Sequence, residues 1–546
     1  MASIGNYSAD TIRKNNNHFS QLKSTVESAF YSNNTQTIST LQDAYNLAAQ
    51  APQTIILDTN VKHATDLGLD PSAKVLLTND GGTVGRTAKA RRIVGEDPSE
   101  DERLMAIIRD AIYQASFRPF IKSRAVVGLD EDFMIKAHIT MPKTAAQHLY
   151  SWLINFQIFN EAYEARYQES KFYDENDIYV FFDPEWSHPV YPDGLAYFDV
   201  KQNVVCILGL RYFGEIKKGT LTLAWASAHR NQYLACHGGL KIFKTASGTH
   251  HVASFFGLSG SGKSTLTHAK HDNKYEIEVL HDDAFIIHTE DGSSVALEPS
   301  YFDKTKDYPT GHPEQDYFVT VQNAGITLDQ DNQKVLVTND IRNGNGRTVK
   351  SRYSTPNRVD KIDEKINSIF WIMKDDTLPP LVKITDPLLA SVFGCTLATK
   401  RSNAENTNDN LNQLVIEPYA NPFRVYPLVE DFNKFKDLFD RGIDAYIINT
   451  GDYLGKKVTP AHSLAAIEAV VDNTGDFKPF GPIEGFEYLE MTDFPVDLDQ
   501  TDQLKEIQNR MQMRLDYILQ HNADHPQHTL DEEVANALNK IIHTLN

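Results

Sequence analysis

The stretch VASFFGLSGSGKSTLTHA, residues 252–269, decides the architecture of this chain. It joins an apolar run, residues 252–256, to a glycine-rich turn and then to a segment typical of a helix start. The turn, Gly257–Ser264, fits G-x-x-x-x-G-K-[ST], a pattern whose glycines let backbone N–H groups approach phosphate oxygens where a Cβ would clash. The alternative is a glycine-rich turn without a ligand, but the strand before it and the helix after it favour a phosphate-binding loop.

The side chains of this loop have distinct roles in such a site. Lys263 places a positive charge on the β- and γ-phosphates of ATP, and the Ser264 hydroxyl can hold Mg²⁺. The residues that we expect to contact ATP here are Gly257, Ser259, Gly260, Ser261, Gly262, Lys263, Ser264 and Thr265.

A pair of carboxylates follows the loop. Residues Glu276–Leu280 read as a second strand, and this strand ends in His281-Asp282-Asp283. Paired carboxylates at a strand end beside a phosphate loop predict a divalent-metal site. A solvated turn or a helix cap is the alternative, because aspartate is common in both.

The rest of the chain mixes strands and helices, which predicts an α/β or α+β sheet protein. We expect polar, weakly periodic surface helices in residues 1–50, a helix over Thr144–Phe159 and a terminal helix over about 501–522. The most loop-like interior stretch is Asn403–Gln413. Predicted strands include Ile178–Phe182, Ala196–Val200, Val204–Leu210 and His251–Leu258.

Composition narrows the class of protein. The 546 residues carry a formal net charge of −20, which argues against a nucleic-acid partner and against docking on an acidic membrane surface. The three cysteines, Cys206, Cys236 and Cys395, form neither a disulfide framework nor a zinc site. Since neither a secretory signal nor an apolar run of about 20 residues is visible, we expect a cytoplasmic protein.

The surroundings of the loop point to one family. Tyr212-Phe-Gly-Glu-Ile-Lys-Lys218-Gly, then His237, the loop and Asp282-Asp283 together resemble the ATP-dependent phosphoenolpyruvate carboxykinases. Other segments resemble motifs of the family in the same order: Gly85–Lys89, Ser351–Pro356, Leu378–Pro380, Asn449–Gly451 and Gly455–Lys457.

The resemblance implies an α/β, two-lobed carboxykinase-like fold with a P-loop nucleotide-binding domain. The division it suggests is an N-terminal helical extension (1–50), a substrate-binding domain (51–245), a nucleotide- and metal-binding domain with a lid (246–500) and C-terminal helices (501–546). It also implies a reaction in which oxaloacetate and ATP give phosphoenolpyruvate, CO₂ and ADP. The small-molecule partners would be oxaloacetate and ATP, and the protein a monomer or a homo-oligomer.

The resemblance also implies two metal ions. Lys218, His237 and Asp283 would hold Mn²⁺ beside the enolate oxygen, where a cation offsets developing charge. Lys218 can ligate only as the free amine, so its pKa would have to be lowered by its surroundings. Ser264 would hold Mg²⁺ on the ATP phosphates, supported by Asp282.

Substrate contacts follow from the same comparison. Arg86, Tyr212, Lys218 and Arg352 would bind the substrate, and Lys218, Arg352 and Lys263 would be catalytic. Forked arginine donors suit a carboxylate or a phosphoryl group. Lys457 would lie on the adenine side, where the family usually has arginine.

Taken singly, these residues have simpler interpretations. Lys217 and Lys218 could be solvated surface charges, His237 a structural histidine, and Tyr212 part of the core. Arg86 could belong to an exposed basic strip. Only the resemblance favours the functional role in each case.

The chain departs from the family pattern next to the aspartate pair, where His281 and Ala284 replace the usual Gly and Glu. Three functions therefore stay open. The first is the carboxykinase reaction, the second is ATP-dependent phosphorylation of another small acid or a hydroxyl compound, and the third is nucleotide binding without catalysis.

Overall fold

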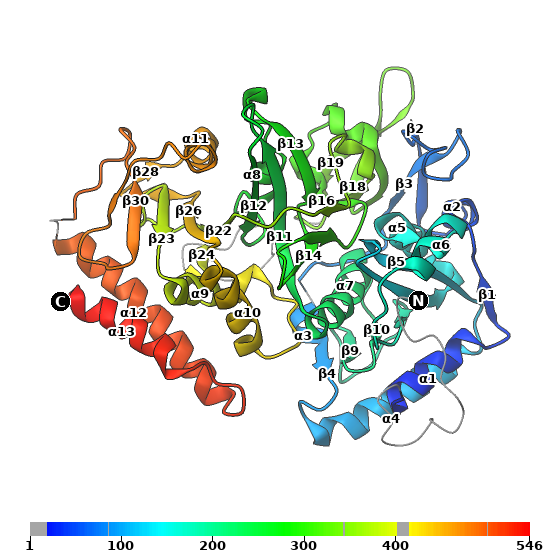
Figure 1. The fold of residues 1–546 in the computed structure, drawn as a ribbon. Coiled ribbons are helices and arrows are strands. Elements are labelled where there is room, and N and C mark those ends of the chain that lie inside the picture. The colour runs from blue at the N-terminus through cyan, green and yellow to red at the C-terminus, as the bar shows by residue number, and fades with distance from the viewer. Residues whose placement is uncertain (1–18, 86, 342–343, 401–413, 499–500, 546) are drawn as a thin grey trace. The chain divides into compact units, whose positions relative to one another are not determined.

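The computed structural model describes residues 19–85, 87–341, 344–400, 414–498 and 501–545. The described chain folds into two compact units. Unit 1 comprises the chain up to Asn231 together with Val295–Pro356, and unit 2 comprises Gln232–Ser294 and the chain from Asn357 onward. Both mix helices with sheets (Figure 1), which confirms the predicted α/β class. The units are discontinuous in sequence, and the roles given above to four consecutive domains stay predictions.

The larger sheet of unit 1 has the strand order β1-β5-β6-β8-β10-β9-β4, with β7 beside β5. The strands β6, β8 and β10 run parallel, whereas β9 is antiparallel to β10. The bounds are β1 Thr35–Thr37, β4 Arg91–Ile93, β5 Phe120–Asp130, β6 Phe133–Pro142, β7 Gln157–Ile158, β8 Ile178–Asp183, β9 Leu195–Asp199 and β10 Val204–Leu208. The three predicted strands of this region are confirmed as β8, β9 and β10.

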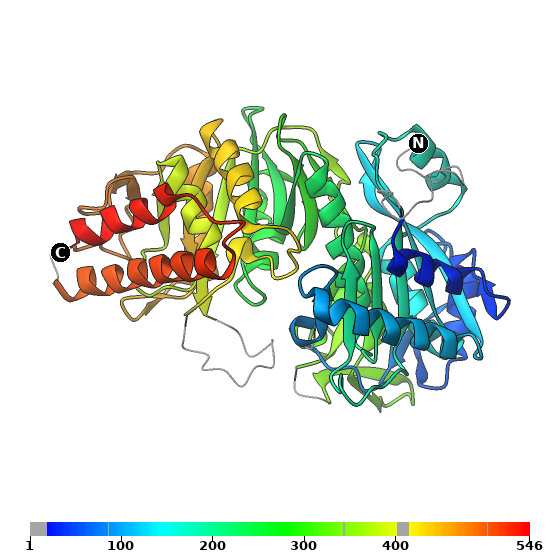
Figure 2. The ribbon, with the colours of Figure 1, turned by 90° about the horizontal axis from the view of Figure 1, so that it is seen from below.

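Two helices cover one face of this sheet, α1 (Gln21–Phe30) and α4 (Pro98–Ala115), and they lie side by side in Figure 2. Their apolar faces form one core with the sheet, made of Leu22, Val26, Phe30, Leu104, Ile108, Phe181, Cys206 and Leu208 among others. With α2 (Leu41–Ala49), α1 confirms the helices predicted before residue 50. The short strand β1 between them was not predicted.

The helix predicted over Thr144–Phe159 is shorter in the structure. A short 3₁₀ turn, Lys143–Ala145, leads into α5, which spans Ala146–Asn155. Phe156 is already extended, and residues 157–158 form β7. The helix ends where the buried Asn155 amide donates to Glu298 at 2.6 Å, a tertiary contact that apolar periodicity does not reveal.

The helix α7 (Phe213–Arg230) runs through the interior of unit 1 and is buried along most of its length. A second sheet follows the order β16-β20-β17-β3-β2, and a hairpin pairs β18 with β19. The bounds are β2 Thr54–Asn60, β3 Lys74–Thr78, α3 Thr87–Ala90, α6 Glu161–Glu169, β16 Tyr301–Lys304, β17 Phe318–Gln322, β18 Ala324–Leu328, β19 Lys334–Asp340 and β20 Arg347–Lys350.

The sheet of unit 2 has the path β14-β11-β12-β22-β26-β23-β30-β29, and β13 also pairs with β11. Its centre is parallel, since β12, β22 and β26 run in one direction. The bounds are β11 Tyr233–Lys244, β12 His250–Phe256, β13 Glu276–His281, β14 Ala284–His288, β22 Ser368–Met373, β23 Leu381–Ile384, β26 Asp444–Asn449, β29 Phe477–Pro479 and β30 Phe486–Leu489. The predicted strands at 251–258 and 276–280 are confirmed as β12 and β13.

Helices surround this sheet, and α12 and α13 pack against each other at the C-terminal end of the chain (red in Figure 1). The helix predicted over 501–522 is confirmed as α12, which buries Ile507, Met511 and Ile518. The stretch Asn403–Gln413 lies outside the described residues. The remaining bounds are α8 Lys263–His268, α9 Pro387–Cys395, α10 Leu428–Asp440, α11 Pro460–Val471, α12 Thr501–Asp524, α13 Glu532–Thr544, β15 Ser294–Ala296, β21 Lys361–Ile362, β24 Ala398–Lys400, β25 Leu414–Ile416, β27 Asp452–Tyr453 and β28 Lys456–Lys457.

The three cysteines are buried and carry free thiols. Burial raises the pKa of Cys206, Cys236 and Cys395. None of the helices in the described part of the chain combines the length and the hydropathy of a membrane-spanning segment.

Candidate active site

The phosphate loop has the predicted strand–loop–helix setting. Gly257–Gly262 connects β12 to α8, which begins at Lys263. Gly262 has φ of 104°, a left-handed conformation that other residues rarely adopt. A Cβ on Gly257 would lie 2.4 Å from Ser261 Oγ, so only glycine fits there without a shift. The two glycines thus shape the turn as the sequence pattern requires.

His237 and Asp283 come together beside this loop. The β11 strand pairs with β13 up to Leu240–His281 and with β14 from His237–Ala284, so the turn between β13 and β14 lies against His237. His237 Nε2 is 3.0 Å from Asp283 Oδ1. Lys263 Nζ lies 3.5 Å from the same His237 nitrogen and 3.8 Å from the same Asp283 oxygen. The predicted site residues His237, Lys263 and Asp283 of unit 2 therefore contact one another.

The second ring nitrogen of His237 shows how the ring is held. Nδ1 lies 2.5 Å from the Ala420 carbonyl oxygen, which can only accept, so Nδ1 carries the proton. In the neutral ring, Nε2 then presents a lone pair to the Asp283 carboxylate, and two such electron-rich atoms attract a cation. Two ligand atoms about 2.1 Å from one cation at a right angle are about 3.0 Å apart. The observed separation and the donor types fit a divalent metal ion.

The third predicted ligand, Lys218, lies in unit 1 on α7. Its Nζ is 5.4 Å from the centre of the Trp225 ring. Its neighbour Lys217 is fully buried and pairs with Glu298 at 2.9 Å, so Lys217 is not a solvated surface charge. Within the described ranges, no cluster of three or more His, Cys, Asp or Glu side chains is arranged to hold a metal ion. The role of Lys218 as a ligand stays a prediction.

Asp282 lies next to the Ser264 hydroxyl, as expected for a pair that supports one ion. Burial alone would raise the pKa of Asp282, but hydrogen bonds from His268 and Ser264 and the charge of His268 hold that pKa below its usual range. His268 Nε2 is 3.3 Å from Asp282 Oδ2. His268 was not predicted, although its position one helical turn after Ser264 is a signal that could have found it.

His281, which replaces the glycine usual in the family, has a structural role in the turn. Its fully buried ring accepts hydrogen bonds at Nδ1 from the backbone N–H groups of Asp283, at 3.0 Å, and Ala284, at 3.2 Å. These two bonds fix the backbone that presents both aspartates. The exchange of residue type thus keeps the turn ordered by a different contact.

The segment expected on the adenine side also borders the loop. Thr450 Oγ1 donates to the Ser261 carbonyl at 2.7 Å, and Lys374 Nζ donates to the Gly260 carbonyl at 2.7 Å. Burial, and then the charge of Lys457, lowers the pKa of Lys374. Lys457 is therefore near the loop, and Lys374 is a neighbour that the sequence did not indicate.

The predicted substrate residues belong to unit 1. Tyr212 precedes α7 and is buried, with the Arg347 guanidinium 5.8 Å from its ring, and burial raises its pKa. Arg352 is half-buried in the 3₁₀ turn that follows β20. Arg86 lies outside the described residues. The substrate roles of all three stay predictions.

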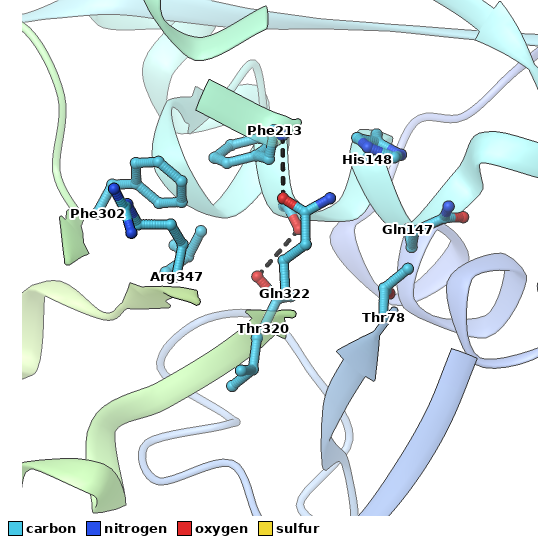
Figure 3. Close-up of a pocket in the computed structure, with 11 residues that line it drawn as sticks. Thr78, Gln147, His148, Phe213, Phe302, Thr320, Gln322 and Arg347 are labelled. Atoms are coloured by element: carbon cyan, nitrogen blue, oxygen red, sulfur yellow. Dashed lines mark hydrogen bonds between the residues drawn. The ribbon is translucent and has the colours of Figure 1, made fainter. Parts of the chain in front are cut away.

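A small cavity of about 20 Å³ lies beside the start of α7 (Figure 3). Gln322 reaches across it and accepts from the Phe213 N–H at 3.2 Å. The same amide donates to Asp80 at 2.9 Å and to the Arg211 carbonyl at 3.0 Å. These bonds fix the first residues of the helix that carries Lys217 and Lys218.

The part of the chain that holds these residues is similar to a known protein family. A model of the phosphoenolpyruvate carboxykinase family matches residues 51–495, more than half of the chain. The chain belongs to this family. All the site residues of this chain that the resemblance predicts lie inside the matched range. The helices α12 and α13 lie beyond it.

Individual carboxykinases are distant relatives. The chain is 25% identical to the phosphoenolpyruvate carboxykinase (ATP) of Aeropyrum pernix over 309 residues, which cover 53% of this chain and 60% of that protein. It is 26% identical to the carboxykinase (ATP) of Dictyostelium discoideum over 217 residues, 36% of each chain. A glycosomal carboxykinase (ATP) of Trypanosoma brucei brucei shares 43% identity over 61 residues, 11% of this chain and 12% of that protein. The chain thus matches less than two thirds of the length of these curated relatives.

Proposed function

We propose that the protein catalyses the ATP-dependent conversion of oxaloacetate to phosphoenolpyruvate, CO₂ and ADP. Membership of the carboxykinase family supports the reaction class. The observation that carries the proposal is the meeting of His237 Nε2 and Asp283 Oδ1, 3.0 Å apart, beside the lysine of the phosphate loop. An ATP-binding protein without a second substrate would not need this donor pair next to the terminal phosphate.

In this proposal the chemistry runs in two steps. The C–C bond to the leaving carboxylate breaks, CO₂ departs, and the electron pair left behind forms the enolate of pyruvate. The enolate oxygen then attacks the γ-phosphorus of ATP, and ADP leaves. A divalent cation, Mn²⁺ or Mg²⁺, would supply positive charge where the enolate oxygen develops.

The residues of unit 2 have separate tasks. Lys263 neutralises the β- and γ-phosphates, and the backbone of the loop orients them. His237, held in one tautomer by the Ala420 carbonyl, and Asp283 would hold the cation. Ser264 and the anionic Asp282 would hold the ion that accompanies ATP.

The residues of unit 1 complete the proposal through the family resemblance. Lys218 would be the third ligand of the cation, and Tyr212 and Arg352 would bind the substrate carboxylates or the transferred phosphoryl group. A free amine at Lys218 would need a lowered pKa, and a nearby cation would lower it. The cytoplasmic location and the state of assembly stay predictions.

The test is a coupled assay for phosphoenolpyruvate with oxaloacetate, ATP and Mn²⁺. We expect Lys218→Ala to lower kcat/KM by about a hundredfold or more, because ligand residues of a metal centre contribute at least that much. ATP binding should persist, since the loop contacts lie in unit 2. Lys201→Ala, an exposed lysine between β9 and β10, serves as the control and should match the wild type. Wild-type protein that formed no phosphoenolpyruvate under these conditions would refute the proposal.

A further inference from the structure

One face of β11 follows α8 along its whole length. Alternate residues of a strand share a face, and here these are His237, Gly239 and Lys241. His237 lies near Lys263, at the start of α8. A Cβ on Gly239 would lie 1.9 Å from Thr267 Oγ1, so glycine permits the close approach of strand and helix. At the far end the fully buried Lys241 reaches the end of the helix.

Lys241 makes three hydrogen bonds there. Its Nζ donates to the carbonyl oxygens of Leu266, at 2.7 Å, and Ala269, at 3.1 Å. The third partner is His271 Nε2, at 3.0 Å. The other His271 nitrogen, Nδ1, is 2.9 Å from the Glu468 carboxylate, to which it donates, so Nε2 is free to accept. An ammonium group has three donors, and this site presents three acceptors.

The backbone after α8 is unusual. His271, Asp272 and Asn273 have φ values of 49°, 51° and 61°. Residues other than glycine adopt this left-handed conformation singly, at a cost of about 1–2 kcal/mol each, and rarely in succession. Such a turn persists only where its surroundings hold it. The chain of contacts from Lys241 through His271 to Glu468 on α11 provides that support.

We propose that Lys241 is a positioning residue of the nucleotide site, which holds the end of α8 against β11 and so fixes Lys263 and Ser264 relative to His237. The inference rests on ATP binding by the phosphate loop. The helix α8 has six residues, about 9 Å of rise. A shift at its last turn therefore moves its first turn as well.

The charge of Lys241 is sensitive to pH. Burial lowers its pKa to about 7, and Glu468 opposes this. Burial, and then Lys241 itself, lowers the pKa of His271 to about 4, so His271 stays neutral above pH 6. The other charged groups of the cluster are Glu468 and Asp472, which Lys274 joins at 3.4 and 2.6 Å. As the pH rises through 7, Lys241 loses one donor, and one of its three acceptors loses its partner.

The experiment measures the Kd of the full-length protein for ATP with Mg²⁺ by calorimetry from pH 6 to pH 9. The variants are Lys241→Met and, as the matched control on the same strand, Lys244→Met, whose ammonium pairs with Glu278 and Glu276 instead. We expect Lys241→Met to weaken ATP binding about tenfold at pH 6 and about twofold at pH 9. The ratio of variant to wild-type Kd cancels the titration of ATP itself. Lys244→Met should stay within twofold of the wild type.

Thermal stability and binding stoichiometry together separate positioning from a purely structural role. Lys241→Met leaves buried acceptors without their donor, so we expect the Tm of the nucleotide-free variant to fall, while the variant stays folded at the temperature of the calorimetry and binds ATP with full stoichiometry. A second variant, Glu468→Gln, removes the carboxylate that favours the ammonium and should shift the loss of wild-type affinity to lower pH.

The outcomes are distinct. A Lys241→Met variant that binds ATP as tightly as the wild type overturns the role of Lys241 alone. A ratio of Kd values independent of pH, or a loss of binding stoichiometry in place of a loss of affinity, overturns it too. Wild-type protein without affinity for ATP at any pH overturns the proposed function and this inference together.

Discussion

Lys263, which we expect to bind the phosphates of ATP, has two neighbours of its own in the structure. Its ammonium lies within 4 Å of both His237 and Asp283, so it offsets the carboxylate charge before any nucleotide binds. The same side chain is suited to the β- and γ-phosphates of ATP. The proposed nucleotide site and the His237–Asp283 pair are thus linked through a single residue.

His251, a buried histidine outside the candidate site, makes the stability of the protein depend on pH. Burial lowers its pKa to about 4, against an ordinary value of 6.5, and Asp444 only partly opposes this. Between these values the unfolded chain binds the proton and the folded chain does not, so the free energy of unfolding falls as the pH is lowered from 6.5 to 4. Between pH 8 and pH 5 we expect His251 to account for a loss of about 2 kcal/mol. Urea unfolding of the wild type and of His251→Gln at pH 8 and pH 5 measures this loss. The variant should lack it.

The neighbouring His250 is the control. It is 40% exposed beside Glu364, so we expect His250→Gln to keep the pH dependence of the wild type. An equal effect of both substitutions, or none from His251→Gln, would contradict the assignment to burial.

The residue types of the site were readable from sequence, whereas their supports were not. The loop motif gives Lys263 and Ser264, and the end of the next predicted strand gives the neighbouring Asp282 and Asp283. The Ala420 carbonyl that orients His237, and the Lys374 amine on Gly260, come from distant segments. Neither has a local pattern, because any residue has a carbonyl and a lone lysine is most often solvated.

Among the helices, α12 is attached to the rest of unit 2 by two arginine side chains. Its Arg514 is fully buried, hydrogen-bonds to the Thr396 carbonyl and lies 4.5 Å from the Phe393 ring. Arg510 on the same helix reaches Asp376 at 3.3 Å. Arg510 thus attaches α12 to the turn after β22 that also carries Lys374, and Arg514 attaches the helix to the end of α9. The helix therefore braces this part of unit 2 from outside the matched family range.

We expect Arg514→Ala to lower the free energy of unfolding by about 3 kcal/mol, because it leaves a cavity and a buried carbonyl without its partner. Urea denaturation provides the measurement. Lys540→Ala on α13 is the control. Its partner is Glu484, both side chains are at least 70% exposed, and the change should stay within about 0.5 kcal/mol. A loss for Arg514→Ala no larger than that of the control would show that Arg514 does not anchor α12 on the end of α9.

Element predictions succeeded where periodicity was regular and failed at tertiary contacts. The strands β8, β10 and β12 are short, largely apolar runs, which is typical of buried strands. The predicted helix over 144–159 was too long, because the Asn155–Glu298 bond ends it. The left-handed turn after α8 was not foreseeable, since its residues carry no glycine signal and the support comes from Lys241 and Glu468.

The whole molecule divides the proposed chemistry between its two units. The loop, His237 and the aspartates belong to unit 2, and Tyr212, Lys218 and Arg352 belong to unit 1. We therefore expect ATP with Mg²⁺ to slow amide hydrogen exchange in Gly257–His268 and Asn449–Val458. Oxalate, a stable stand-in for the enolate, should slow exchange in residues 347–354 and at the start of α7, because ligand contacts suppress local opening.

Exchange followed by mass spectrometry checks this division, and the exposed hairpin β18–β19 is an internal control that neither ligand should change. Protection of unit 1 by ATP without protection of the loop would contradict the assignment. The sequence predicted both sets of residues, but the division suggested by the resemblance puts His237 in residues 51–245 and Arg352 in residues 246–500. In the structure His237 belongs to unit 2 and Arg352 to unit 1, because unit 1 takes up Val295–Pro356 after the chain has already entered unit 2.

The buried cysteines have a practical consequence at this scale. All three thiols are enclosed, and their raised pKa values keep them protonated near neutral pH. Maleimide dyes, which attack thiolates, should therefore leave the native chain unlabelled. A pair of cysteines engineered on the surface, one in each unit, would accept fluorophores at chosen positions only and report by energy transfer how the units respond to substrates.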